Sequence, residues 1–220
     1  MGISYKTRNV PKLLAVWVFN VVLFLGIIGG SWDFGIGGIP QALLSYTVAD
    51  FKEKLPFLGL LTLVAVFNGV FPRSVKECLV FWPDGRPGER AFSHFMLKDS
   101  TIDKKVLQTH FGPLPSASDE QNALWVTWLH EFDNDARIRS PYELYLFARD
   151  WTIIAAAILI LATPMAFWFS KATVLSFLYV AILVVQCLLA RQVARVQGEQ
   201  LVKSVMVLKG SSVSVRETIK

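Results

Sequence analysis

Six basic side chains in the polar middle of the chain have the chemistry of an anion-binding site. Arg86 and Arg90 flank a Gly/Pro-rich turn, and guanidinium groups bind phosphate through paired hydrogen bonds. The candidate ligand-binding residues are Arg86, Arg90, His94, Lys98, Arg137 and Arg139. Trp82 could stack on a base, so the pattern is compatible with a nucleotide or oligonucleotide ligand. Acidic residues are interleaved throughout, and a solvated surface of mixed charge is the other interpretation.

The same region shows no pattern of catalytic residues. His130-Glu131 is not part of an H-E-x-x-H motif, because position 134 is Asn134. The alternating acids Glu131, Asp133 and Asp135 lack the spacing of a calcium-binding loop. There is no P-loop, no dinucleotide fingerprint and no G-x-S-x-G motif. We therefore expect no enzyme activity, no cofactor and no bound metal.

Apolar stretches must hold this polar region in place. Hydrophobic residues make up 53% of the 220 residues, and they gather into runs at 13–30, 55–71, 151–169 and 172–190. These runs approach the length of about 20 residues that a helix needs to cross a bilayer. The sequence therefore predicts a mainly α membrane protein with four transmembrane helices in two hairpins, 1–72 and 151–190. Residues 31–55 are expected to be an ordinary connector, with an interfacial helix or a re-entrant segment as alternatives.

Residues 73–150 are expected to form a small cytoplasmic α+β domain between the second and third spans. The stretch 77–82 is β-branched and aromatic, which favours a strand, and 90–97 is expected to return as a second strand. The Pro/Gly-rich sequence between them has strong turn chemistry. Helices are expected at 102–110 and 118–131.

Trp125 and Trp128 lie on one face of the expected helix 118–131. An aromatic stripe of this kind is far more often a core or a subunit contact than a cofactor site. In the scaffold interpretation the same face would recruit a cytosolic protein partner.

Ser140, Pro141 and Glu143 have the residue types of a helix start. Nothing between Glu143 and Trp151 breaks a helix, so one helix should leave the domain and become the third span. Pro164 would kink that span, because proline removes a backbone hydrogen bond. We therefore expect Ser140, Pro141 and Pro164 to act in gating.

A few polar residues lie inside the apolar runs, where they are energetically costly and should face inward. The candidate pore-lining residues are Asn20, Thr62, Asn68, Ser176 and Gln186. Hydrogen bonding between helices is the commonest role of such residues, and lining a water path is the other. Four spans make a poor conduit, so a channel would require a homo-oligomer, for which a tetramer is favoured.

Lys and Arg gather in the first twelve residues, at the flanks of 73–150 and in the basic tail 191–220. The positive-inside rule then places both termini and the polar domain in the cytoplasm. The chain is expected to be a multi-pass protein of a bacterial inner membrane.

In layout the chain resembles small bacterial membrane effectors of antiphage defence systems. In these, a cytosolic sensor of a nucleotide or oligonucleotide signal is joined to a few spans that permeabilise the inner membrane. The resemblance covers the four expected spans and the basic turn WPDGRPGER (82–90), and it carries over no residue's role. It implies a homo-oligomeric channel or pore that opens when the cytoplasmic domain binds a ligand or partner. The alternatives are a membrane scaffold or sensor that recruits a cytosolic partner without conductance and, last, a membrane-bound enzyme.

Overall fold

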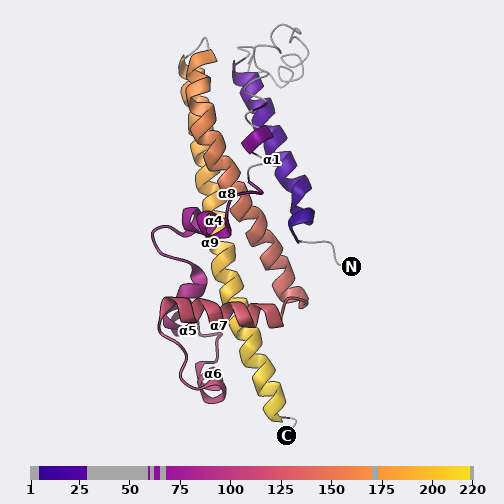
Figure 1. Ribbon diagram of the computed structural model, residues 1–220, viewed down its shortest axis with the longest axis vertical. Helices are drawn as coiled ribbons and strands as arrows, with labels where there is room; N and C mark the ends of the chain where they lie inside the picture. The colour runs from indigo at the N-terminus through magenta and orange to yellow at the C-terminus, as the bar shows by residue number, and fades with distance from the viewer. Residues whose placement is uncertain (1–4, 29–58, 60–61, 65–67, 170–172, 219–220) are drawn as a thin grey trace. The chain divides into compact units, whose positions relative to one another are not determined.

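The computed structural model describes residues 5–28, 59, 62–64, 68–169 and 173–218 (Figure 1). The elements are α1 (Tyr5–Ile28), α4 (Arg73–Phe81), the 3-10 helix η1 (Pro87–Arg90), the π-helix η2 (Ala91–Phe95), α5 (Met96–Lys98), α6 (Lys104–Phe111), α7 (Ser118–Glu131), α8 (Ala136–Phe169) and α9 (Thr173–Thr218). Contacts divide the chain into two compact units. Unit 1 comprises residues 1–76 and 147–191, and unit 2 comprises residues 77–146 and 192–220. The expected connector 31–55 lies outside the described residues.

The predicted α+β domain is wrong, because all regular secondary structure among the described residues of 73–150 is helical. The expected strand 77–82 is the end of α4 and the turn after it. Its buried side chains Val80 and Phe81 are adjacent and lie between the exposed Leu79 and Trp82, so burial does not alternate as it would along a strand. The expected strand 90–97 falls in the last residue of η1, in η2 and in α5. A short apolar run does not distinguish a strand from a helix of the same length.

The prediction of four membrane spans is corrected to three. Among the described residues, three helices contain a segment long and apolar enough to cross a membrane: Arg8–Leu25, Ala136–Trp168 and Thr173–Val213. Most of the expected second span, 55–71, lies outside the described residues. Of its described residues, 59 and 62–64 are helical and 68–70 form a turn, where Asn68-Gly69 and the following Pro72 favour a turn.

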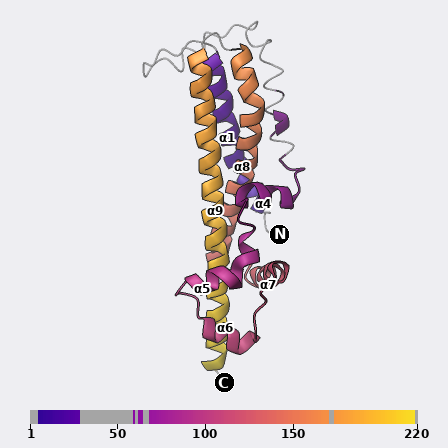
Figure 2. The same ribbon diagram turned by 90° about the vertical axis from the view of Figure 1, so that its left-hand side faces the viewer.

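In unit 1, α1 and the unit 1 parts of α8 and α9 lie side by side (Figure 1, Figure 2). Their core includes Phe24, Ile158, Ala162, Ala166 and Tyr179, each with none of its surface exposed. The two alanines are of the small type that lets helices approach closely in membranes. The ring of Phe24 meets that of Tyr179 edge-on, with 5.7 Å between the centroids.

In unit 2, α7 packs on η1 and η2. The ring centroid of Phe92 lies 5.1 Å from that of Trp128, and Phe111 contacts the same indole from α6 at 5.2 Å. A Cβ atom on Gly88 of η1 would stand 2.9 Å from the ring of Trp125. Glycine is therefore needed at position 88 for η1 to approach α7 this closely.

The side chain of Gln121 joins α7 to η2 in the interior of unit 2, where it is 1% exposed. Its Oε1 accepts hydrogen bonds from the backbone N–H groups of Phe92 at 3.0 Å and Ser93 at 3.1 Å. Its Nε2 donates to the carbonyl oxygen of Ser116 at 2.7 Å. One side-chain amide thus accepts hydrogen bonds from two backbone N–H groups of η2, a π-helix whose backbone hydrogen bonding departs from the α-helical pattern.

Replacement of Gln121 by leucine is expected to lower the free energy of unfolding of unit 2 by about 2 kcal/mol. The substitution leaves buried backbone donors without an acceptor, and each such group costs about 1–3 kcal/mol. Thermal unfolding followed by circular dichroism in detergent measures the loss. The matched control is Gln108→Leu, since Gln108 is exposed on α6 and should tolerate the change. Equal unfolding temperatures for the two variants would contradict the assigned role.

Candidate functional site

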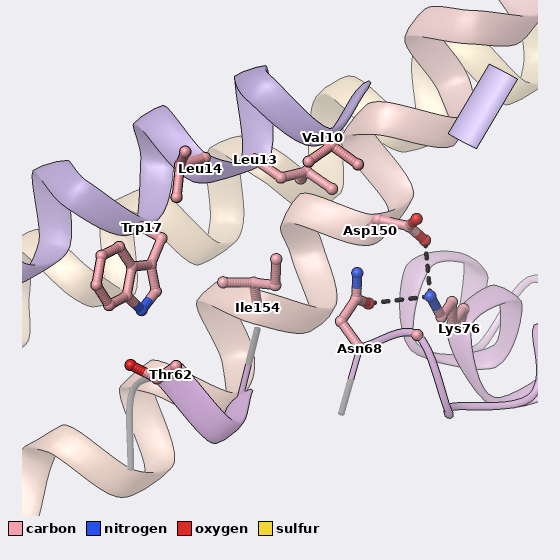
Figure 3. A pocket seen from close by; sticks show the side chains of 10 residues that line it. Val10, Leu13, Leu14, Trp17, Thr62, Asn68, Lys76, Asp150 and Ile154 are labelled. Carbon is pink, nitrogen blue, oxygen red and sulfur yellow. Dashed lines mark hydrogen bonds and ion pairs between the residues drawn. The ribbon is translucent and has the colours of Figure 1, made fainter. Parts of the chain in front are cut away.

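A buried cluster of charged and polar side chains lies in unit 1 (Figure 3). Lys76 Nζ donates to Asn68 Oδ1 and contacts Asp150 Oδ1, both at 2.9 Å. Arg149 approaches the same carboxylate oxygen, with its NH2 nitrogen at 3.2 Å. The side chains of Lys76 and Arg149 are each 6% exposed, and that of Asp150 is 14% exposed. Buried charges of this kind are tolerated only where they are paired and hydrogen-bonded.

The cluster joins residues far apart in the sequence. Lys76 lies in the first half of α4, Asp150 lies in α8, and Asn68 stands in the turn before α4. Lys76 and Arg149 are among the basic residues at the flanks of 73–150 that were expected to mark the cytoplasmic edge of the membrane, and their ion pairs with Asp150 were not predicted. Its only local signal is an acidic residue directly before an apolar run.

An apolar cavity of about 410 Å³ adjoins this cluster in unit 1 (Figure 3). One wall comes from α1, the polar end comes from the cluster, and Ile154 of α8 contributes a further apolar side chain. The lining residues are Val10, Leu13, Leu14, Trp17, Thr62, Asn68, Gly69, Lys76, Asp150 and Ile154.

The predicted pore-lining residues do not share one surface. Asn68 and Thr62 both line the cavity. Asn20 is fully buried, and its Nδ2 donates to the carbonyl oxygen of Val16 within α1 at 2.8 Å. Ser176 is 1% exposed, and its hydroxyl donates to the carbonyl oxygen of Ala166 in α8 at 3.0 Å. Gln186 is partly buried on α9.

Several buried polar atoms of unit 1 have no hydrogen-bond partner within the part of the chain that the structure describes. They are Trp17 Nε1, Asn20 Oδ1, Trp151 Nε1, Tyr179 Oη and Gln186 Oε1, with Asn20 and Tyr179 fully buried. An unsatisfied polar group in a membrane interior costs several kcal/mol. The sequence reading missed Tyr179, although a tyrosine in an otherwise apolar run is a visible signal.

The predicted anion-binding residues all belong to unit 2, and most of them contact acidic or aromatic neighbours. Arg86 Nε lies 3.2 Å from Glu77 Oε2 and 3.6 Å from Glu89 Oε1. Arg90 stacks on the Phe95 ring, with 5.9 Å between Cζ and the ring centroid. His94 meets the Phe95 ring edge-on at 5.1 Å, and Lys98 is exposed.

The other two predicted anion-binding residues lie in the first turns of α8. Arg137 pairs with Asp135 at 2.8 Å, and Arg139 Nε lies 3.4 Å from Glu143. Hydrogen bonds from Arg137 hold the pKa of Asp135 below its ordinary value. An anionic ligand would have to compete with these carboxylates.

The basic residues of 191–220, expected as a tail, belong mostly to α9 and tie it to the rest of unit 2. Arg195 pairs with Asp84, and Lys209 pairs with Glu131. Lys203 lies 3.4 Å from Asp99. Hydrogen bonds from Thr101, and then the charge of Lys203, lower the pKa of Asp99.

Trp125 and Trp128, the predicted partner contacts, are 6% and 2% exposed in unit 2. Only a rearrangement of α7 would bring them to a partner. The exposed tryptophan of this unit is Trp82, at 68%.

The predicted gating residues Ser140, Pro141 and Pro164 all lie within α8. The helix begins at Ala136 instead of near Ser140. The reason is that Asp135 caps it, accepting a hydrogen bond from the backbone N–H of Arg137 at 2.9 Å through its side chain. As expected from the absence of breakers, α8 runs without interruption from residues of unit 2 into residues of unit 1.

Within the described ranges, no three His, Cys, Asp or Glu side chains gather in a way that could hold a metal ion. No known protein family, curated protein or solved structure matches this chain. The class of protein therefore follows from the molecule alone: a helical protein in which the described residues include three helices long and apolar enough to cross a membrane.

Proposed function

We propose that this chain is the subunit of a homo-oligomeric channel or pore-forming effector of a bacterial inner membrane. In this proposal unit 1 forms the membrane part, and unit 2 receives a cytoplasmic signal, with antiphage defence as the setting that the layout suggests. The observation that carries the proposal is the set of buried polar atoms of unit 1 that lack a partner. Asn20 Oδ1 and Tyr179 Oη are fully buried within one chain, and water would satisfy them in an open state in which the helices of unit 1 separate.

The outward face of α9 in unit 1 supports assembly with lipid or with further copies of the chain. Its exposed side chains are large and apolar, with Val174 at 78%, Phe177 at 62%, Leu188 at 57% and Leu189 at 56%. Large apolar patches of this kind mark surfaces that bind membrane or protein. This face would therefore bind lipid or further copies of the chain.

Two helices supply a route from signal to pore. Both α8 and α9 contribute residues to unit 2 and continue into unit 1. Ligand binding that favours one arrangement of unit 2 would act on the membrane helices through the backbone itself. The six basic residues of unit 2 remain the proposed ligand contacts, and the ligand would displace the acidic partners of Arg86, Arg137 and Arg139.

The contacts within unit 1 support placing the beginning of α1 and the beginning of α4 on the same, cytoplasmic side. Val10 of α1 lines the same cavity as Asp150, whereas Phe24 of α1 packs on Tyr179. By Asn68 the chain again contacts the Asp150 end of the unit, through Lys76. The beginning of α1 and the beginning of α4 therefore belong to the same end of unit 1.

Conductance in planar bilayers tests this proposal. Purified full-length chain should pass ionic current, and short cyclic or linear oligonucleotides should change the open probability if unit 2 is the receiver. Asn20→Leu should reduce the current, whereas Gln108→Leu, exposed on α6 of unit 2, serves as the control. An impermeable monomer would contradict the proposal.

A membrane scaffold or sensor without conductance is the second candidate. It is favoured by the closed interior of unit 1, where Phe24, Ile158 and Ala162 are fully buried within a single chain. No conductance, together with co-purification of a cytosolic partner, would support this function in place of the first.

A further inference from the structure

Helix α4 buries two charged side chains and exposes apolar ones. Lys76 and Glu77 are only 5% and 4% exposed, whereas Val75 and Leu79 are 47% and 40% exposed. Val75 and Leu79 stand four residues apart, so they lie on the same face of the helix. A helix at the surface of a soluble protein usually directs its charged residues to water and its apolar face to the core.

Trp82 continues this apolar face past the end of α4. Its backbone N–H donates to the carbonyl oxygen of Cys78 at 2.9 Å, so the helical turn extends to this residue. Trp82 follows Leu79 by three residues and Val75 by seven, which is the spacing of one helix face. Its side chain is 68% exposed. Val75, Leu79 and Trp82 together form the outer face of α4.

The buried charges of α4 are paired inside the protein. Lys76 Nζ lies 2.9 Å from Asp150 Oδ1 in unit 1, and Glu77 Oε2 lies 3.2 Å from Arg86 Nε in unit 2. These pairs fix which side of α4 turns inward, because an unpaired buried charge is strongly destabilising. The outer face therefore stays exposed, and apolar surfaces of this kind bind membrane or protein.

The contact with Asp150 places the beginning of α4 at the boundary of the apolar part of unit 1. Asp150 directly precedes the apolar run 151–169 of α8, and Figure 3 shows the side chain of Lys76 reaching it. A carboxylate at the edge of a span avoids the hydrocarbon interior, where a charge is costly. The start of α4 therefore lies at the level where lipid meets water.

We propose that α4 is an interfacial helix, whose outer face docks into the lipid surface of the cytoplasmic leaflet. Three observations support the bilayer as the partner: the paired charges turn the apolar side of α4 outward, Lys76 ties the helix to the edge of a span, and the face ends in Trp82. Tryptophan is enriched where one end of its side chain is apolar and the other is wet.

The edge of the outer face is polar. Ser74 and Cys78 are exposed, and each stands about 100° around the helix from its neighbour Val75 or Leu79. In the proposal this edge faces the cytoplasm while the outer face contacts lipid. The proposal goes beyond the channel function and does not depend on conductance.

Spin labels on the full-length chain in phosphatidylethanolamine/phosphatidylglycerol liposomes test the proposal. Val75→Cys and Leu79→Cys are labelled one at a time in a chain that carries Cys78→Ser and Cys187→Ser. Collisions with oxygen, which dissolves in lipid, should exceed collisions with a water-soluble nickel chelate at both positions. The order should be reversed at the control Gln108→Cys, which is exposed on α6.

Val185→Cys on α9 is the second control, because Val185 is 55% exposed within an apolar helix. Oxygen collisions should dominate there if unit 1 lies in the membrane. Dominance of nickel collisions at 75 and 79, with oxygen dominance at 185, would overturn the interfacial helix and leave the membrane placement of unit 1 intact. Few collisions with either reagent at 75 and 79 would also overturn it, because a second copy or another protein would then cover the face.

The native chain offers a test without substitutions, which applies even if a cysteine variant does not fold. A phosphatidylglycerol analogue with a diazirine close to its head group should label a peptide that contains residues 75–82, as detected by mass spectrometry. Label confined to the apolar parts of α1, α8 and α9 would contradict the proposal.

Discussion

Replacement of Asp150 by asparagine is expected to lower the free energy of unfolding of unit 1 by about 3–5 kcal/mol. The carboxylate is the shared partner of Lys76 and Arg149, and all three side chains are at least 86% buried. Its loss removes the carboxylate that the two cations share, and their mutual repulsion is costly in a region of low dielectric. The destabilisation is measured by thermal unfolding in detergent, and amide hydrogen exchange should show increased opening at the start of α4.

Removal of the carboxylate should destabilise unit 1 more than removal of either cation alone, which distinguishes a cluster held by Asp150 from other arrangements. Lys76→Met should destabilise unit 1 less than Asp150→Asn, because Asp150 keeps its contact with Arg149. Asp135→Asn is the matched control outside the cluster. It removes an exposed ion pair with Arg137 while an asparagine can still cap α8, so stability should change little. A larger loss for Lys76→Met than for Asp150→Asn would show that the cluster is not held by its shared carboxylate.

Replacement of Gly198 by valine is expected to destabilise unit 2 by about 1–3 kcal/mol, the usual cost of overpacking a filled interior. A Cβ atom at this position would stand 2.7 Å from Phe81 Cζ and 3.3 Å from the ring of Tyr145. Phe81 is 2% exposed and has little room to move. Glycine at 198 thus allows α9 to contact the end of α4 inside unit 2.

Gly210, on the same helix, is the control with an effect of opposite sign. A Cβ atom there meets nothing within 4 Å, so Gly210→Ala should gain about 1 kcal/mol from helix propensity. Urea unfolding followed by circular dichroism measures both variants. If Gly198→Val stabilised the protein as Gly210→Ala is expected to do, the close packing of α9 on Phe81 would be refuted.

The sequence predicted the elements whose signal is local. Runs of apolar residues identified α1 and the unit 1 parts of α8 and α9, because bilayer thickness sets the length of such a helix. Helix α7 begins and ends where expected. The two strand predictions were wrong because the composition of a short apolar run such as 77–82 fits a strand and a helix equally well. The start of α8 was misplaced because Ser140-Pro141 resembles a helix start, while Asp135 had already capped the helix.

Contacts between distant residues could not be predicted from a single sequence. Lys76 and Asp150 are 74 positions apart, and only the fold brings them to one cavity. The hydrogen bonds of Gln121 could not be predicted for the same reason, since its partners Phe92 and Ser93 lie in another element. The basic residues of unit 2 were recognised as a group, but a pattern of residue types does not reveal that Arg86 contacts Glu77.

The account depends most on the placement of apolar helices in a bilayer with unit 2 in the cytoplasm. Cys78 reports on this directly, because it is exposed in α4 and belongs to unit 2. A membrane-impermeant maleimide, applied to sealed vesicles carrying the Cys187→Ser chain, should label Cys78 in inside-out vesicles and leave it unlabelled in right-side-out vesicles. Labelling of Cys78 in right-side-out vesicles would contradict the account.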